Sequence, residues 1–200
     1  MAATLYLVRH AAHARVNDTL CGRMPGVSLG EEGRRQAERV AERLAGEDIG
    51  AVFSSPLARA IETAKPIGRR LGLPVQVSEA LNEIDFGAWT GRRFDDLADD
   101  PTWTAWNRIR TAVVPPGGER LLSAAARILA FAKTLAAADP DRGTVLVTHG
   151  DLIRTALCEF LDCRSLGDYA LFEVGPGSVT RVALWPGGWR VMSVNEAVAA

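Results

Sequence analysis

The segment LYLVRHA, residues 5–11, sets an apolar run directly against an arginine and a histidine. Such a short apolar run is typical of a buried strand. Arg9 and His10 follow at its end, where polar and charged groups beside a core are costly unless an anion meets them. The segment therefore predicts a strand that carries a local anion site at its carboxyl end.

Outside this segment, short apolar runs alternate with longer amphipathic ones. Strands are expected at residues 4–8, 51–54, 75–77, 144–148, 178–185 and 189–194. Helices are expected after Gly30 up to Gly46, and at residues 57–71, where Pro66 should kink or break the helix, 121–135 and 152–161. The last two strands flank Pro186, Gly187 and Gly188 and form the pattern of a hairpin. This alternation predicts an α/β fold, a three-layer α/β/α sandwich with a mostly parallel central sheet.

Composition limits the classes of function. The chain has 200 residues, of which 48% are hydrophobic, so we expect a single domain over residues 1–200. A net charge of −1 gives no overall attraction to nucleic acid or to an anionic membrane, so any anion site must be local. Cys21, Cys158 and Cys163 lack CxxC spacing, which disfavours a disulfide framework or a zinc site and fits a reducing cytoplasm. The first apolar run ends at Arg9, too early for a signal peptide or a membrane span.

Three predicted strand ends carry unusual polar residues. Arg9 and His10 end the first strand, Arg59 follows the second, and His149 ends the fourth. Because ligands collect at the carboxyl ends of parallel strands, these side chains are expected to meet in one crevice. Alone, each has an ordinary explanation: a solvated strand end, a surface arginine paired with Glu62, or a strand-to-helix turn.

Five segments resemble, in order and spacing, the motifs of the histidine phosphatase superfamily, the phosphoglycerate mutase-like proteins. They are LYLVRHA (5–11), FSSPLARAIETA (53–64), LNEIDFGAWTG (81–91), PPGGER (115–120) and VLVTHGDLIRTAL (145–157). The resemblance looks closest to the small phosphatase branch that includes α-ribazole phosphatase-like and broad-specificity phosphatases. It implies a phosphatase that hydrolyses phosphate monoesters of small metabolites through a phosphohistidine, with no metal or organic cofactor.

The resemblance also implies a role for each site residue. His10 would be the nucleophile, Arg9 and Arg59 would hold the phosphoryl oxygens, His149 would be the second histidine and Glu83 the proton donor. The chemistry fits, because a neutral imidazole meets a phosphate dianion more easily than an anion does, and nearby arginines help to keep it neutral. Further substrate contacts are expected at Asn17, Gly22 and Gly150.

Several positions depart from the family pattern. Ala11 stands where a glycine is usual, and a positive φ there would cost roughly 1 kcal/mol. His13 stands where a threonine is usual, and it either replaces a phosphate-facing hydroxyl or faces solvent. Asn17 lies one residue further from His10 than the family's phosphate-loop asparagine. Gly22 either admits the substrate to the backbone or is an ordinary turn glycine.

Residues 92–119 are expected to form a small helical lid over the leaving group. The segment carries Trp103 and Trp106, which alternatively pack a helical layer, together with Arg108 and Arg110. Two other functions stay open: a phosphoglycerate mutase, although the family's mutases usually have a longer insertion before the second histidine, and a non-catalytic phosphate-binding protein. We expect a cytoplasmic protein that binds a small phosphate monoester but neither nucleic acid nor membrane. The sequence does not decide between a monomer and a homodimer.

Overall fold

A six-stranded sheet organises the computed structural model, which describes residues 2–163 and 171–198. Its strands lie in the order β3 (Val75–Val77), β2 (Ile49–Ser54), β4 (Gly143–Thr148), β1 (Ala3–Arg9), β5 (Val179–Trp185) and β6 (Gly188–Glu196). The first four of these are mutually parallel, and β5 and β6 pair antiparallel. The predicted mostly parallel sheet and its terminal hairpin are therefore confirmed.

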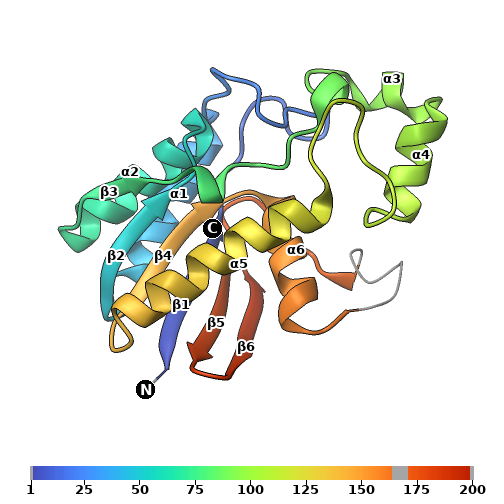
Figure 1. Cartoon of the computed structure of the whole chain (residues 1–200). Coiled ribbons are helices and arrows are strands. Elements are labelled where there is room, and N and C mark those ends of the chain that lie inside the picture. The colour runs from blue at the N-terminus through green and yellow to red at the C-terminus, as the bar shows by residue number, and fades with distance from the viewer. Residues whose placement is uncertain (1, 164–170, 199–200) are drawn as a thin grey trace.

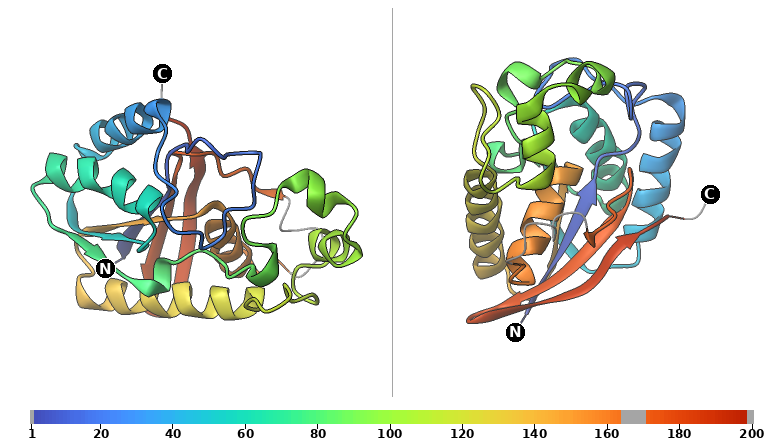
Figure 2. Two further views of the ribbon diagram at one scale, coloured as in Figure 1. Left: turned by 90° about the horizontal axis from the view of Figure 1, so that it is seen from above. Right: turned by 90° about the vertical axis from the view of Figure 1, so that its right-hand side faces the viewer.

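Helices cover both faces of the sheet (Figures 1 and 2). One face carries α1 (Glu31–Leu44) and α2 (Ala58–Leu71), and the other carries α5 (Leu121–Ala138) and α6 (Gly150–Phe160). The local break expected at Pro66 is wrong, because α2 continues through this buried residue, while the alternative of a kink stays a prediction. Packing of the buried face outweighs the one backbone hydrogen bond that a proline removes.

The central strand β1 is buried on both faces, as its apolar run requires. Leu5 and Leu7 belong to the core under α5 and α6. Tyr6 and Val8, which alternate with them, belong to the core under α1 and α2. Burial on both faces leaves only the end of the strand for polar chemistry, and Arg9 and His10 lie there.

Helix α5 is apolar as well as long. Among the residues described, it is the one helix whose length and mean hydropathy, 1.5 over 18 residues, would allow a membrane crossing. Core helices share this composition, and here Leu121, Ala124, Ile128 and Ala132 of α5 are buried against the rest of the core. The apolar face is therefore used inside the fold.

Residues 92–119 project beyond the sheet with α3 (Phe94–Ala98) and α4 (Pro101–Arg108) (Figure 1). Trp106 is fully buried and meets Phe86 and Trp89 edge to face. Trp103 is only partly buried and lines the cavity described below. Trp106 is thus a packing residue, and closure of this segment over a ligand stays a prediction.

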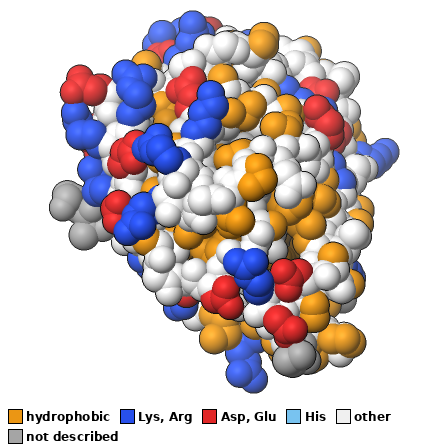
Figure 3. All heavy atoms as spheres, turned by 90° about the vertical axis from the view of Figure 1, so that its left-hand side faces the viewer, with side chains coloured by type: hydrophobic (Ala, Val, Ile, Leu, Met, Phe, Trp, Pro, Cys, Tyr) orange, Lys and Arg blue, Asp and Glu red, His pale blue; other side chains and the backbone are white. Residues whose placement is uncertain are grey.

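Charged side chains of both signs are intermixed on the face shown in Figure 3. Between α1 and α2, Arg69 pairs with Glu38 at 2.7 Å and Arg70 with Glu42 at 3.2 Å. Such exposed pairs contribute little to stability. They leave no field of one sign on these helices, which agrees with the net charge of −1 and with an anion site that is local.

Candidate active site

A cavity of about 300 Å³ opens at the carboxyl ends of the parallel strands. All but one of the residues proposed from the sequence line it: Arg9, His10, Asn17, Gly22, Arg59, Glu83 and Gly150. The exception, His149, is fully buried directly behind the cavity, with its ring centroid 5.2 Å from that of His10. The structure therefore brings the predicted residues to one place.

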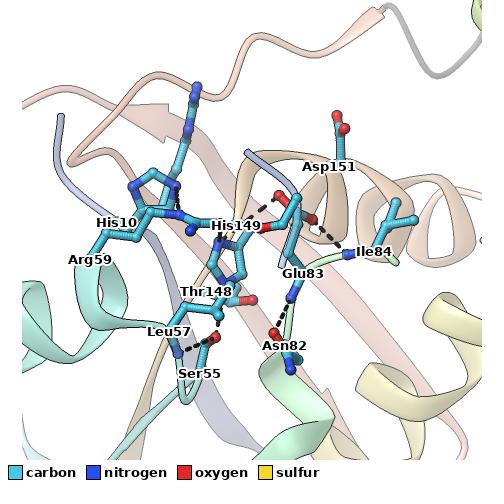
Figure 4. A network of polar contacts seen from close by, with 12 residues as sticks. His10, Ser55, Leu57, Arg59, Asn82, Glu83, Ile84, Thr148, His149 and Asp151 are labelled. Carbon is cyan, nitrogen blue, oxygen red and sulfur yellow. Dashed lines mark hydrogen bonds and ion pairs between the residues drawn. The ribbon is translucent and has the colours of Figure 1, made fainter. Parts of the chain in front are cut away.

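The proton position on His10 is fixed by the backbone. Its Nδ1 lies 2.8 Å from the carbonyl oxygen of Ala11 and donates to it, because a carbonyl can only accept. In the neutral ring Nε2 then carries a lone pair, and Arg59 Nε donates to this lone pair at 3.2 Å (Figure 4). His10 thus presents Nε2 as a nucleophilic nitrogen.

Both buried histidines are held neutral. Burial keeps the pKa of His10 well below its ordinary value, and the charges of Arg59 and Arg9 act in the same direction. The pKa of His149 is also held well below its ordinary value, first by burial and then by Arg59. Neither ring has to lose a proton at neutral pH before it can act as a base or nucleophile.

The two arginines beside His10 have donors to spare. Arg59, only 2% exposed, donates from Nη2 to the Gly22 carbonyl at 2.7 Å, while its buried Nη1 has no hydrogen-bond partner in the described chain. Arg9 donates from Nη1 to the Val174 carbonyl, and its buried Nε also has no partner there. Buried donors without partners are costly, and an oxyanion in the cavity would satisfy them.

Glu83 lies in the loop between the short helices η1 (Glu79–Leu81) and η2 (Gly87–Trp89). Its Oε1 accepts the Ile84 N–H at 2.9 Å, and its Oε2 lies 3.9 Å from His149 Nδ1. Burial, followed by the charge of Asp151, raises the pKa of Glu83 to about 7. A carboxyl with this pKa can donate and accept a proton near neutrality.

Asp85, a second carboxylate in the same loop, does not line the cavity. Its Oδ1 accepts the Gly87 N–H at 2.9 Å, and its Oδ2 lies 3.7 Å from Arg23 Nη1. These contacts serve the loop, so the geometry favours Glu83 as the acid.

A charged clamp that the sequence reasoning missed holds the Glu83 loop. The Glu83 carbonyl accepts from Arg23 Nε at 2.8 Å and from Arg127 Nη2 at 3.1 Å. Glu119 Oε1 accepts from both arginines, at 3.1 and 2.8 Å. The PPGGER segment, which contains Glu119, was the sequence feature that could have indicated this clamp.

Two glycines allow the Glu83 loop and the PPGGER segment to touch. Gly87 has φ +52°, and a Cβ there would lie 2.2 Å from the Pro116 carbonyl oxygen. A Cβ at Gly118 would lie 2.3 Å from the Asp85 carbonyl oxygen. Side chains at either position would force the segments apart.

The structure shows the environment of the residues near His10 that depart from the family pattern. Ala11 is not among the residues with positive φ, so the alanine causes no backbone strain there, and its N–H donates to Thr63 Oγ1 at 3.0 Å. The ring centroid of His13 lies 5.4 Å from that of His10, and the side chain lines the cavity, which supports the cavity-facing alternative. Asn17 lines the cavity with φ +64°.

The two predicted glycines approach the site arginines. Gly22 has φ +45°, and a Cβ there would lie 2.9 Å from Thr90 Oγ1. The Gly22 carbonyl accepts from Arg59 Nη2 at 2.7 Å and the residue lies in a turn, as the turn alternative expects, whereas contact of its backbone with a substrate stays a prediction. At Gly150, a Cβ would lie 3.1 Å from Arg9 Nε.

The fold and the site together define an α/β enzyme architecture with a buried, neutral histidine set among arginine donors and a carboxylic acid. Such a site suits the transfer of phosphoryl groups, where positioning and charge stabilisation dominate. The chain belongs to the histidine phosphatase superfamily (branch 1), whose family model matches residues 5–197.

Named relatives give the chemistry of this family. The chain is 33% identical over 199 residues to glucosyl-3-phosphoglycerate phosphatase of Mycobacterium tuberculosis, covering 93% of this chain and 87% of that protein. It is 30% identical over 162 residues to phosphoserine phosphatase 1 of Hydrogenobacter thermophilus, covering 78% of this chain and 75% of that protein. The native structure of mycobacterial glucosyl-3-phosphoglycerate phosphatase superposes with a TM-score of 0.88 at 32% identity, covering 98% of this chain and 100% of that one. The chain is therefore a phosphatase, a hydrolase of small phosphate esters.

Proposed function

We propose that this phosphatase acts through a phosphohistidine on His10. The observation that carries the proposal is the lone pair on His10 Nε2. It follows because the Ala11 carbonyl fixes the proton of the neutral ring on Nδ1. The unpartnered donors of Arg9 and Arg59 stand beside it, ready for phosphoryl oxygens. A non-catalytic phosphate-binding protein does not require a nucleophilic nitrogen beside these arginine donors.

In the first step, the lone pair of His10 Nε2 forms a bond to phosphorus as the ester P–O bond breaks. Arg59 and Arg9 donate to the equatorial oxygens, whose charge is spread in the transition state. Glu83, protonated for this step, gives its proton to the departing oxygen, so an alcohol leaves. The pKa of about 7 makes the protonated form available at neutral pH.

In the second step, water attacks the phosphorus and the P–N bond breaks, which returns the lone pair to His10. Glu83, now ionised, accepts the proton that the water loses. The products are inorganic phosphate and the alcohol, and the site is restored. Every group in this cycle belongs to the chain or to the substrate.

The proposal extends to the substrate, for which we infer a leaving group with a second anionic group. Arg15, Arg110 and Arg154 also line the cavity, and Asp151, which lines it too, pairs with Arg110 and Arg154. The cavity lining holds more arginines than carboxylates, and this positive excess suits a carboxylate on the substrate. Two relatives are named for phosphate esters that carry one, a glucosyl-phosphoglycerate and phosphoserine. The free thiols of Cys21 and Cys163 support a reducing, cytoplasmic setting.

Rapid quench with a ³²P-labelled phosphomonoester tests the phosphohistidine. Wild type is expected to yield an acid-labile, base-stable adduct, and His10→Ala none. A full yield on the variant would overturn the assignment of His10. Product analysis then separates the remaining alternatives: return of the phosphoryl group to another hydroxyl of the product indicates a mutase. Tight phosphate binding without turnover indicates a non-catalytic protein.

A further inference from the structure

His13 forms a second imidazole on the wall of the cavity, and no step of the proposed reaction uses it. Its ring centroid lies 5.4 Å from that of His10, with 32° between the two ring planes. The half-buried side chain lines the cavity, and an isolated backbone bridge to Leu29 holds the residue in place. The chain that leads away from His10 therefore returns a second ring to its side.

The backbone fixes the proton position on this ring. Nδ1 of His13 accepts the Arg15 N–H at 3.3 Å, because a backbone N–H can only donate. Burial lowers the pKa of His13 to about 4, and the charges of Arg59, Arg9 and Arg15 act in the same direction, so the ring is neutral at pH 7. Its single proton is then on Nε2, which makes no hydrogen bond to the described part of the chain. The ring thus offers an N–H donor.

Arg59 and Arg9 place an anion beside this donor. Arg59 Nε donates to His10 Nε2 at 3.2 Å (Figure 4), and both arginines keep a buried donor that has no partner in the described chain. After burial, the charge of Arg59 is the largest influence on the pKa of His13, which agrees with a ring that lies toward Arg59. In a near-attack complex the phosphorus lies about 3 to 3.5 Å from His10 Nε2. Its oxygens then extend across the distance that separates the two rings.

We propose that His13 is a substrate-binding residue whose Nε2–H donates to an oxygen of the phosphoryl group held by Arg9 and Arg59. The proposal rests on the proposed function, in which these two arginines bind the phosphoryl oxygens. A neutral donor suits this place, because it adds a hydrogen bond to an oxyanion where guanidinium groups already supply the positive charge. The Arg15 N–H keeps Nδ1 as the acceptor, so the donor stays on Nε2.

Equilibrium binding of inorganic phosphate tests the contact without turnover. The Kd should rise about 10- to 100-fold in His13→Ala, the loss of one hydrogen bond to an anion. His13→Gln places an amide N–H near the position of Nε2 and should keep most of the affinity, whereas His13→Asn places it near Nδ1 and should not. Ala14→Ser, an exposed change in the same turn and outside the cavity lining, is the control. An unchanged Kd in His13→Ala, or equal losses in the glutamine and asparagine variants, would overturn the proposal.

Ring ¹⁵N spectra give a second readout, because the chain has three histidines. With assignments from His13→Gln and His10→Asn, His13 is expected as the Nε2–H tautomer, and its Nε2 resonance should shift when inorganic phosphate is added. An Nδ1–H tautomer in wild type, or an Nε2 resonance that phosphate leaves unmoved, contradicts the proposal. Rapid quench separates this proposal from the proposed function. A wild type that binds phosphate through His13 but forms no adduct with a labelled ester would reject the phosphohistidine and leave the His13 contact standing.

Discussion

The two halves of the site are built by different means. The nucleophile half, with His10, Arg59 and His149, takes its residues from the ends of parallel strands or the first turn of the following helix. The acid half, with Glu83, lies in an irregular loop held by Arg23, Arg127 and Glu119. Sheet register sets the first half, and hydrogen-bonded charges set the second.

This difference separates binding and attack from proton transfer. Strands buried on both faces give the nucleophile and its arginines little freedom, which suits a transition state stabilised by preorganised donors. The loop can place its carboxyl beside Asp151 and out of water, which tunes the pKa. Loss of a residue from one half should therefore leave a different kinetic signature from loss in the other.

The largest expected effect lies in the acid half. Glu83→Gln should slow phosphorylation of His10 by an alkyl phosphate about 10²- to 10⁴-fold, the span of general acid catalysis. It should slow p-nitrophenyl phosphate much less, because that phenolate leaves without a proton. Single-turnover rates with both esters measure this. Equal losses would contradict the acid role, and the same selective loss in Asp85→Asn would move the role to Asp85.

In the nucleophile half, Arg59→Ala should reduce turnover by roughly 10²- to 10³-fold, the cost of removing a preorganised donor. The reduction in turnover of His149→Ala should lie in the same range. Both esters should be affected alike, since the lost donors act on the phosphoryl group. Arg69→Ala is the control, an exposed arginine on the same helix as Arg59. Near-normal activity in Arg59→Ala would show that the residues at the end of β2 do not take part in the reaction.

The smallest expected effect is a shift in the pH dependence of phosphorylation. Phosphorylation by an alkyl phosphate requires protonated Glu83, so its rate should fall as the pH rises through about 7. Asp151→Asn removes a negative charge that raises the pKa of Glu83, so the fall should begin at lower pH. Glu159→Gln, an exposed change on the same helix, is the control. An unmoved profile in Asp151→Asn would mean that burial alone sets the pKa of Glu83.

Much of the nucleophile half was predictable because it follows from strand pattern. Apolar runs located β1, β2 and β4, and parallel pairing places their carboxyl ends together. Arg9, Arg59 and His149 therefore converge as their positions indicate. Whether Ala11 is strained could not be predicted, since the cost depended on a positive φ that the backbone there does not adopt.

The sequence by itself determined the order of strands and helices and which side chains stand at the strand ends, because these follow from local periodicity. Only the tertiary structure decided which nitrogen of His10 carries the lone pair, since the local backbone brings the Ala11 carbonyl to Nδ1 and Arg59, 49 residues away in the chain, donates to Nε2. It also decided the pKa of Glu83, because burial and Asp151 act through space. Proton positions depend on distances between segments far apart in the chain, which periodicity does not encode.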